Sequence, residues 1–343
     1  MKIPVCMKSD SYDIILERGV LARAGEQLQL NRRVLIVTDD GVPAAYARAV
    51  AAACKLPTVV TLLQGESTKN SKSYLKLLRT MANAGFSRKD CVVAVGGGVM
   101  GDLAGFAAAT YMRGVDFYNI PTTLLSMVDS SIGGKVAIDL DGIKNIVGAF
   151  YQPCRVLIDP DVLDTLSPRQ IRAGLAEAIK MAATCDDGLL SYIEDMDPDR
   201  TTAEQWDHVI EGALRIKKSV VEVDPTEKGL RRVLNFGHTV GHAVESSQNG
   251  RYLHGECVAL GMLPMCAPKV RERLRRLLER WELPTHVSTT SEELLPYLCH
   301  DKKMSEDVIV TVHVETAGSY VFRSETVSEI LSGISCMLDE KNE

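Results

Sequence analysis

Three short apolar runs, two of them followed by a helix-type pattern, constrain the fold of this chain more than any other feature. Residues 33–38, 58–63 and 91–95 are typical of buried strands, and helix patterns follow the first two at about 43–54 and 71–84. Strands that alternate with helices in this way form a parallel sheet with helices on both faces. The first part of the chain is therefore predicted to be an α/β domain.

The pattern changes near residue 167. Strand signals nearly vanish until residues 308–312, and long amphipathic helical stretches cover 168–183, 203–223, 235–246 and 255–282. Ser167 and Pro168 supply an N-cap and a first-turn proline for the first of these helices. We therefore expect two domains, an α/β domain over residues 1–166 and a mostly α-helical domain over residues 167–343.

Composition excludes several classes of protein. A net charge of −6 argues against a general nucleic-acid binder, so an anionic ligand must be met by a local basic cluster. No 18-residue apolar run and no signal-peptide stretch at the N-terminus are visible, which predicts no membrane span. The nine cysteines are scattered and none forms a CxxC pair, as expected for reduced thiols in a cytoplasmic protein.

A glycine-rich segment follows the third predicted strand directly. Residues 96–101 (GGGVMG) match the pattern in which glycines let backbone amides approach a pyrophosphate at a helix N-terminus. The acidic residue that usually follows about 20 positions later is not cleanly placed, and Asp39, at the end of an earlier strand, is a better partner for a ribose hydroxyl. This segment predicts dinucleotide binding.

A second polar, glycine-rich zone follows at residues 129–135 (DSSIGGK) and 142–145 (GIKN). Lysines beside Gly-Gly turns and serine hydroxyls suit a phosphate or a polyhydroxyl ligand. An ordinary solvated loop is the alternative interpretation.

Three of the seven histidines lie within 17 residues. His238 and His242 share one helix face, and His254 follows on the next segment. Such a cluster indicates a divalent metal, a proton relay, or both. Alternatively, Gly237 and Gly241 serve only close helix packing and the histidines are incidental. The spacing lacks the glutamate of zinc peptidases, which argues against that class.

Glu177 and Lys180 lie three residues apart among apolar and small neighbours, so their shared helix face is predicted to be buried. A buried glutamate near histidines is a candidate metal ligand. Further cations that could meet an anionic substrate are Lys217, Arg231, Lys302 and Lys303.

Long motifs in sequence order resemble the 3-dehydroquinate synthase family of sugar-phosphate cyclases. The resemblance runs from about Asp39 to Lys303. It is strongest at residues 96–106 (GGGVMGDLAGF), 111–145, 174–180 (GLAEAIK), 230–245 (LRRVLNFGHTVGHAVE) and 254–262 (HGECVALGM).

The resemblance implies a Rossmann-like NAD-binding domain followed by a helical domain that binds metal and substrate. It implies a homodimeric lyase of the shikimate pathway that converts 3-deoxy-D-arabino-heptulosonate 7-phosphate to 3-dehydroquinate and phosphate. NAD acts catalytically in such an enzyme, together with zinc or cobalt. Hydride leaves to NAD and returns, and phosphate is eliminated in between.

The resemblance also assigns roles to individual residues. Glu177, His238 and His254 are the implied metal ligands, while His242 transfers protons and Arg113 reaches across the dimer interface. The implied substrate pocket comprises Asp129, Lys135, Asn145, Lys180, Lys217, Arg231, Asn235 and one of Lys302 and Lys303. The implied NAD contacts are Asp39, Glu66, Lys69, Gly97, Gly98, Asp102, Thr122, Thr123, Lys144 and Thr165.

Three alternatives remain: another sugar-phosphate cyclase such as 2-deoxy-scyllo-inosose synthase, a metal-dependent polyol dehydrogenase, and a non-catalytic NAD-binding sensor. A sensor would need no metal triad. The chain departs from the family pattern where Pro264 and Pro268 interrupt an expected continuous helix, and where residues 269–280 are rich in arginine. The stretch 285–299 aligns weakly.

Overall fold

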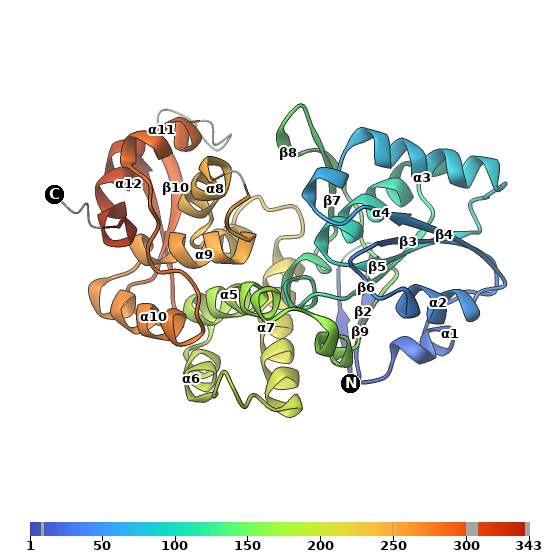
Figure 1. Cartoon of the computed structure of the whole chain (residues 1–343), viewed down its shortest axis with the longest axis horizontal. Helices are drawn as coiled ribbons and strands as arrows, with labels where there is room; N and C mark the ends of the chain where they lie inside the picture. Colours follow the sequence, from blue (N-terminus) through green and yellow to red (C-terminus); the bar gives the residue numbers. More distant parts are fainter. Residues whose placement is uncertain (8–9, 249, 300–307, 340–343) are drawn as a thin grey trace. The chain divides into compact units, whose positions relative to one another are not determined.

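The computed structural model describes residues 1–7, 10–248, 250–299 and 308–339. The chain forms two compact units, Met1–Leu166 and Ser167–Glu343 (Figure 1). The first unit is an α/β sheet domain and the second is mainly helical. This confirms the predicted fold class.

A seven-stranded sheet forms the first unit. Its strands, in spatial order, are β1 (Lys2–Val5), β2 (Tyr12–Leu16), β9 (Arg155–Ile158), β6 (Asp116–Pro121), β5 (Cys91–Gly96), β3 (Arg33–Asp39) and β4 (Leu56–Leu62). Every neighbouring pair is parallel except the antiparallel pair β1–β2. The carboxyl ends of β3, β5 and β6 therefore meet at one edge of the sheet, where α/β proteins bind ligands.

Helices cover both faces of this sheet. Figure 1 shows α3 (Ser71–Asn83) and α4 (Gly98–Thr110) on one side, and α1 (Ala24–Gln27) and α2 (Ala44–Ala52) on the other. Asn70 caps α3 by accepting hydrogen bonds from the amides of Lys72 and Ser73. Leu77 and Met81, one turn apart, then pack into the core beside Leu103 of α4. The short helices of this unit are η1 (Leu21–Arg23), η2 (Glu66–Thr68), η3 (Tyr111–Arg113), η4 (Ser126–Ser130) and η5 (Pro160–Thr165).

Part of the second polar zone of the sequence lies on a β-hairpin, and residues 129–134 precede this hairpin. Strands β7 (Lys135–Leu140) and β8 (Ile143–Phe150) pair in antiparallel fashion, with an irregularity between Ile138 and Leu140. β7 packs its apolar face on α4, whereas β8 is exposed along most of its length. Lys135 and residues 143–145 of the polar zone therefore lie on strands, and the phosphate or polyhydroxyl ligand stays a prediction.

The second unit consists mainly of helices. They are α5 (Pro168–Cys185), α6 (Asp187–Asp195), α7 (Ala203–Val223), η6 (Leu230–Asn235), α8 (His238–Ser247), α9 (His254–Met262), η7 (Leu263–Met265), α10 (Pro268–Arg280), α11 (Ser291–Cys299), α12 (Val327–Gly333) and η8 (Ile334–Met337). A two-stranded sheet, β10 (Val308–His313) with β11 (Val321–Thr326), completes the unit. Ser167 accepts a hydrogen bond from the amide of Gln170 and so caps α5, with Pro168 at its first position.

The single helical stretch predicted over 255–282 is wrong. Pro264 lies in η7 and Pro268 opens α10, so the chain breaks between α9 and α10. A proline inside a helix removes an amide donor and clashes with the preceding turn, which explains the break.

The arginine-rich α10 is held by its own arginines. Arg273 donates to both carboxylate oxygens of Glu194 at 2.7 Å and to Ser191 Oγ at 2.9 Å. Arg271 donates to the carbonyl oxygens of Leu263 and Cys266. These arginines fasten α10 to α6 and to the preceding turn, so they explain the unusual composition as local packing.

Two further findings concern the chain as a whole. Among the described residues, no helix has the length and apolar character needed to cross a membrane. The cysteines whose side chains are described are free thiols.

Candidate active site

Glycines bring three helices of the second unit into backbone contact. A Cβ at position 255 would lie 1.8 Å from the carbonyl oxygen of Ala173, and one at position 261 would lie 2.0 Å from that of Gly237. Gly237 also adopts a φ of 76°, which favours glycine, immediately before α8. Close packing and the histidine cluster therefore occur together, because these contacts bring α5, α8 and α9 to one point.

Glu177 lies at that point. Its side chain on α5 is completely buried, and neither carboxylate oxygen has a hydrogen-bond partner of normal geometry among the described residues. Lys180 Nζ lies 2.6 Å from Oε2, while Oε1 lies 3.3 Å from His254 Nε2 and 3.7 Å from His238 Nε2. A buried carboxylate needs compensating charge, which Lys180 supplies at Oε2, while Oε1 faces the two histidine nitrogens.

The other ring nitrogen of each histidine has its own partner. His238 Nδ1 lies 3.1 Å from the carbonyl oxygen of Phe236, and His254 Nδ1 lies 3.1 Å from Glu245 Oε2. A proton on each Nδ1 satisfies both contacts and leaves Nε2 as the ligand atom that faces Glu177. Partners of this kind orient metal-binding histidines.

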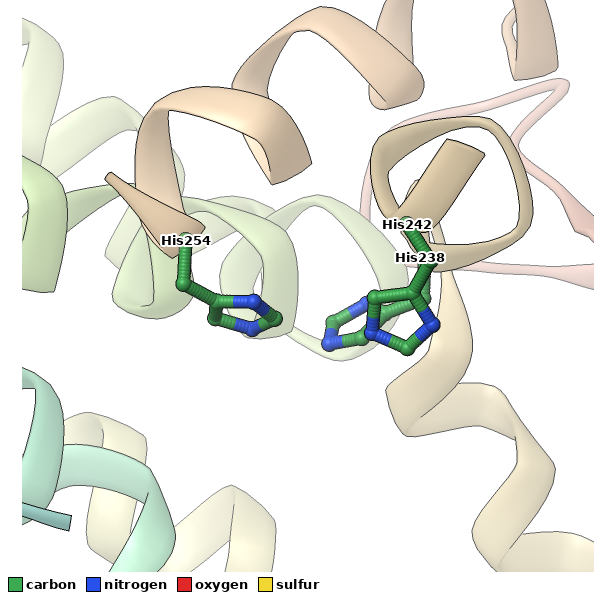
Figure 2. Close-up of side chains that lie close together, drawn as sticks. All are labelled: His238, His242 and His254. Carbon is green, nitrogen blue, oxygen red and sulfur yellow. The ribbon is translucent and has the colours of Figure 1, made fainter. Parts of the chain in front are cut away.

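Three histidine rings of α8 and α9 lie close together (Figure 2). The ring centroids of His238 and His254 are 5.3 Å apart, and His242 lies 5.2 Å from the first and 5.7 Å from the second. Their ligand atoms lie within 4.8 Å of one another. His238 is buried and His242 is exposed, although both project from α8.

The groups of the cluster shift one another's pKa values. Burial would raise the pKa of Glu177, but Lys180, His254 and His238 hold it well below its usual range. Burial and the charge of Lys180 lower the pKa of His238 well below its usual value, so this ring is neutral. Burial opposes protonation of His254 too, but its bonds to Glu177 and Glu245 raise its pKa to about 10.

The spacing of the ligand atoms fits a small ion. Two ligands at roughly 2.0–2.1 Å from a tetrahedral ion lie about 3.3–3.4 Å apart. The Glu177 to His254 distance of 3.3 Å matches that edge, and the His238 distance of 3.7 Å is close to it. The residues present therefore fit a divalent metal such as Zn²⁺.

Other predicted residues of this unit lie on neighbouring elements. Lys217, on α7, and Arg231, on η6, are both buried. Arg231 Nη1 donates to the carbonyl oxygen of Pro225 at 2.7 Å, and Asn235 Nδ2 donates to Glu227 Oε1 at 2.7 Å. Lys302 and Lys303 lie outside the described residues.

Sequence reasoning missed Glu227 and Glu245. Glu245 lies seven residues after His238, two turns along the same helix face, so its spacing was a usable signal. Glu227 lies in a loop with a φ of 57°, and no periodicity pointed to it.

In the first unit, the predicted glycines stand at the carboxyl edge of the sheet. Gly97 precedes α4 and Gly98 begins it, and no side chain among the described residues caps this helix. A Cβ on Gly98 would lie 2.9 Å from Ser130 Oγ. The N-terminal amides of α4 are therefore available to an anion such as a pyrophosphate.

Several predicted cofactor residues adjoin this edge. Asp39 ends β3 and accepts a hydrogen bond from the amide of Gly41, and burial raises its pKa. The amide of Thr122 donates to the carbonyl oxygen of Gly96 at 3.0 Å, and Thr123 lies against Gly97. These contacts bring four predicted residues and Gly96 into one region.

A buried lysine links three more of them. Lys69 Nζ lies 2.7 Å from Asp102 Oδ2 and 3.4 Å from Glu66 Oε1. Lys69 is 4% exposed. Burial raises the pKa of Asp102 to about 6 despite the charge of Lys69.

The polar hairpin joins this group through its backbone and through a small cavity. Asp139 Oδ1 accepts from the amide of Asn145 at 2.8 Å, and the amide of Asp139 donates to the carbonyl oxygen of Lys69 at 2.8 Å. A cavity of about 10 Å³, room for one water molecule, is lined by residues that include Asp102, Ser130 and Lys135.

The other four predicted residues of this unit lie on different elements or next to them. Arg113 ends η3 with a φ of 68°. Thr165 lies 3.0 Å from the hydroxyl of Tyr46, Asp129 lies in η4, and Lys144 lies on the exposed strand β8.

Comparison with known proteins identifies relatives along most of the chain. The family described as 3-dehydroquinate synthase N-terminal matches residues 59–173, and that described as 3-dehydroquinate synthase C-terminal matches residues 174–304. A 3-dehydroquinate synthase from Symbiobacterium thermophilum is 41% identical over 88% of this chain and 90% of its own length. One from Enterococcus faecalis is 39% identical over 96% of this chain and 97% of its own.

Solved structures of related cyclases share the fold. A 2-deoxy-scyllo-inosose synthase complexed with carbaglucose-6-phosphate, NAD⁺ and Co²⁺ is 24% identical, with a TM-score of 0.89 over 97% of this chain and 99% of its own. A 2-epi-5-epi-valiolone synthase from Streptomyces hygroscopicus with NAD⁺ and Zn²⁺ bound is 27% identical, with a TM-score of 0.88 over 96% and 97%. With two family matches that together span 59–304 and relatives near 40% identity, the chain belongs to the 3-dehydroquinate synthase family.

Proposed function

We propose that this chain converts 3-deoxy-D-arabino-heptulosonate 7-phosphate to 3-dehydroquinate and phosphate, with catalytic NAD and a divalent metal, Zn²⁺ or Co²⁺. It is an enzyme of the lyase class with a small-molecule substrate. The proposal rests first on Glu177, a completely buried carboxylate that faces Lys180 Nζ and two histidine Nε2 atoms. The identity of the substrate is supported by the relatives near 40% identity.

In this proposal, Glu177, His238 and His254 hold the metal, and Glu245 orients His254. The α4 N-terminus holds the NAD pyrophosphate. The cofactor residues are Asp39, Glu66, Lys69, Gly97, Gly98, Asp102, Thr122, Thr123, Lys144 and Thr165. When bound, the metal supplies a Lewis acid for the substrate hydroxyls, and NAD accepts and returns a hydride.

The chain's own residues position the substrate and move its protons. Lys180 and Lys217 are buried cations that can bind substrate oxygens, and Arg231 can form a paired contact with an anionic group. Asp129, Lys135, Asn145 and Asn235 complete the proposed pocket. His242 is exposed beside the buried His238, so it can exchange protons with the substrate and with water.

We also propose a homodimer in which Arg113 enters the partner's site. Met112, Arg113 and Gly114 have φ values of 49°, 68° and 119° in succession. Two non-glycine residues in the left-handed region are costly and mark positions that a function retains. The shikimate pathway and a cytoplasmic location, expected from the resemblance and the cysteines, stay predictions.

The decisive experiment measures phosphate release from the heptulosonate phosphate by metal-loaded protein with NAD well below the substrate concentration. Many turnovers per NAD and 3-dehydroquinate as the product, identified by NMR, are expected. Accumulation of NADH in proportion to product would indicate a polyol dehydrogenase instead. Turnover of glucose 6-phosphate, whose carba analogue occupies the structural relative, would indicate the other cyclase.

Subunit mixing tests the dimer. Arg113→Ala and His238→Ala protomers should each be inactive alone, because each homodimer lacks one necessary group at both sites. After random exchange, half of the dimers are mixed and each has one complete site, so about a quarter of wild-type activity should return. An inactive mixture with proven exchange would refute the shared site.

A further inference from the structure

We infer that Asp224 is a positioning residue whose carboxylate holds the loop carrying Glu227 and Arg231 in the shape that substrate binding requires. This inference rests on the proposed function, in which Arg231 and Asn235 contact the substrate. Asp224 does not itself reach the substrate in this account. It acts through the backbone of the loop.

The carboxylate of Asp224 accepts hydrogen bonds from several amides of the loop. Asp224 immediately follows α7, the helix that carries Lys217. Its Oδ1 accepts a hydrogen bond from the amide of Lys228 at 2.9 Å, and its Oδ2 accepts from the amides of Gly229 and Arg231 at 2.7 and 3.1 Å. Three amides that follow Asp224 by four to seven residues thus converge on its side chain.

The loop would not hold this shape by itself. Glu227 adopts a φ of 57°, a left-handed conformation that is strained for a residue with a side chain. Such strain persists only where the surroundings impose it, and the hydrogen bonds to Asp224 close the loop on the C-terminal side of Glu227.

Two of the substrate-binding candidates, Arg231 and Asn235, contact that loop. Glu227 Oε1 accepts from Asn235 Nδ2, and Arg231 Nη1 donates to the carbonyl oxygen of Pro225. Asp224 fixes the main chain of Arg231, while the loop fixes both side-chain contacts. A shift of the loop therefore moves Arg231 and Asn235 together.

The loop stabilises the ionised form of Asp224. Asp224 is buried, which would raise its pKa, but the three amides and the charge of Arg231 lower it overall. Asparagine has the same shape and offers one acceptor oxygen, while its NH₂ group would face an amide donor. Asp224→Asn thus breaks the contacts with the least change in volume.

A matched control comes from Asp90 in the first unit. Asp90 is also buried and accepts three hydrogen bonds, from the amides of Arg33 and Ser87 and from Ser87 Oγ. It precedes β5, at the sheet end opposite to the glycine-rich segment. Asp90→Asn therefore disturbs an equivalent set of hydrogen bonds to a buried carboxylate without changing a candidate site residue.

The experiment compares metal-loaded wild type, Asp224→Asn and Asp90→Asn with the heptulosonate phosphate and NAD. We expect Asp224→Asn to lower kcat/KM by about 10²-fold, mostly through KM, since small misplacement of positioning groups has effects of that size. Metal content and NAD affinity should stay at wild-type values. Asp90→Asn should lower the melting temperature while leaving kcat/KM unchanged.

Hydrogen exchange supplies a readout that needs no substrate. The amides of residues 226–235 should exchange at least about tenfold faster in Asp224→Asn, while α5 and α8 keep wild-type rates. Asp224→Glu, which keeps the charge but displaces it, should show a smaller loss of kcat/KM and answers the question if Asp224→Asn does not fold. Faster exchange with kcat/KM within twofold of wild type would overturn the inference, as would unchanged exchange. An inactive wild type would refute the proposed function, and the exchange data would still decide whether Asp224 holds the loop.

Discussion

Two buried lysines pair with carboxylates at nearly equal distances, but the two pairs differ in what surrounds them. Lys180 lies 2.6 Å from Glu177 in the second unit, and Lys69 lies 2.7 Å from Asp102 in the first. Glu177 is one acid among three bases, whereas Lys69 is one base that also faces Glu66 and Asp139. The pKa of Glu177 is therefore lowered well below its usual range and that of Asp102 is raised to about 6.

This difference assigns a separate purpose to each pair. A carboxylate that stays ionised can bind a metal without first losing a proton. A carboxylate with a raised pKa that shares its lysine with two other acids is suited to hold a polar ligand, not a metal. Proximity of Lys to Asp or Glu thus does not define a site, because the neighbouring charges decide its chemistry.

The largest expected difference between the two pairs is in the metal content of variants that lack the carboxylate. Glu177→Gln should lose the metal and reduce turnover by about 10⁴-fold or more, since a Lewis acid supplies several kcal/mol. Asp102→Asn should retain a full complement of metal. Elemental analysis and steady-state assays check both, and a metal-loaded, active Glu177→Gln would break the comparison.

The two histidines of α8 should also differ in whether their replacement removes the metal. His242→Ala should keep metal and NAD but lose about 10²–10⁴-fold in turnover, the usual contribution of one proton-transfer group. His238→Ala, the matched variant one helical turn away, should lose metal as well. If His242→Ala is purified without metal, the histidine-only set of three ligands replaces the one with Glu177.

A side chain at the α4 N-terminus should disturb the first unit alone. Gly98→Val adds atoms where a Cβ would already lie 2.9 Å from Ser130 Oγ, on the path of the proposed pyrophosphate. NAD affinity should fall by roughly 10–100-fold, the equivalent of about 1.4–2.7 kcal/mol. Calorimetry of NAD binding, with metal content as the control, contradicts the placement if affinity is unchanged.

Metal binding should release a proton from the second unit. Metal-free His254 has a pKa of about 10 and is protonated at pH 7.5, whereas the lowered pKa of His238 leaves that ring neutral. Zn²⁺ should therefore displace about one proton, and its affinity should rise about tenfold per pH unit between pH 6 and 9. Calorimetry in buffers of different ionisation enthalpy measures the proton count, and a count of zero excludes a protonated His254 as ligand.

The first unit should show a smaller pH effect of its own. Because the folded pKa of Asp102, about 6, lies above its unfolded value, the folded state holds the proton more tightly. Stability from this group should thus fall as the pH rises from about 4 to 6, by about 1–2 kcal/mol after allowance for its 20% exposure. Asp102→Asn should remove this dependence in thermal unfolding.

Asp90 provides the opposite control. Burial works against its ionisation, but its hydrogen bonds to Ser87 and Arg33 lower its pKa. Its contribution is therefore present above its unfolded pKa and is lost as the pH falls. If Asp90→Asn and Asp102→Asn changed the pH profile in the same direction, the charge assignment of the first unit would be wrong.

Much of the fold was predictable because apolar periodicity encodes buried strands and amphipathic helices. The strand predicted at 33–38 is β3, and the helix predicted at 203–223 is α7. β6 was not recognised, since its segment contains Asp116, Asn119 and Pro121, residues that are depleted in strands. β8 was missed because its exposed face carries no pattern of burial.

The site was predictable where the type and spacing of residues alone indicate their chemistry. Histidine spacing and an unusual glutamate among apolar neighbours indicated the cluster around Glu177. The role that we infer for Asp224 could not be predicted, because it depends on three backbone amides that only the folded loop brings together. Residue identity gives no information about which main-chain groups a carboxylate will meet.

The backbone contacts of Gly255 and Gly261 have a consequence for which ions the protein can accept. Where helices touch through main-chain atoms, no side chain can rearrange to let them separate or slide. The helices α5, α8 and α9, which carry the proposed ligand atoms, are consequently held at fixed separations. An ion such as Ca²⁺, which needs six to eight oxygen ligands at longer distances, would have to force the helices apart. Small ions that accept few ligands need no such separation, so we expect this backbone packing to favour them at the proposed metal site.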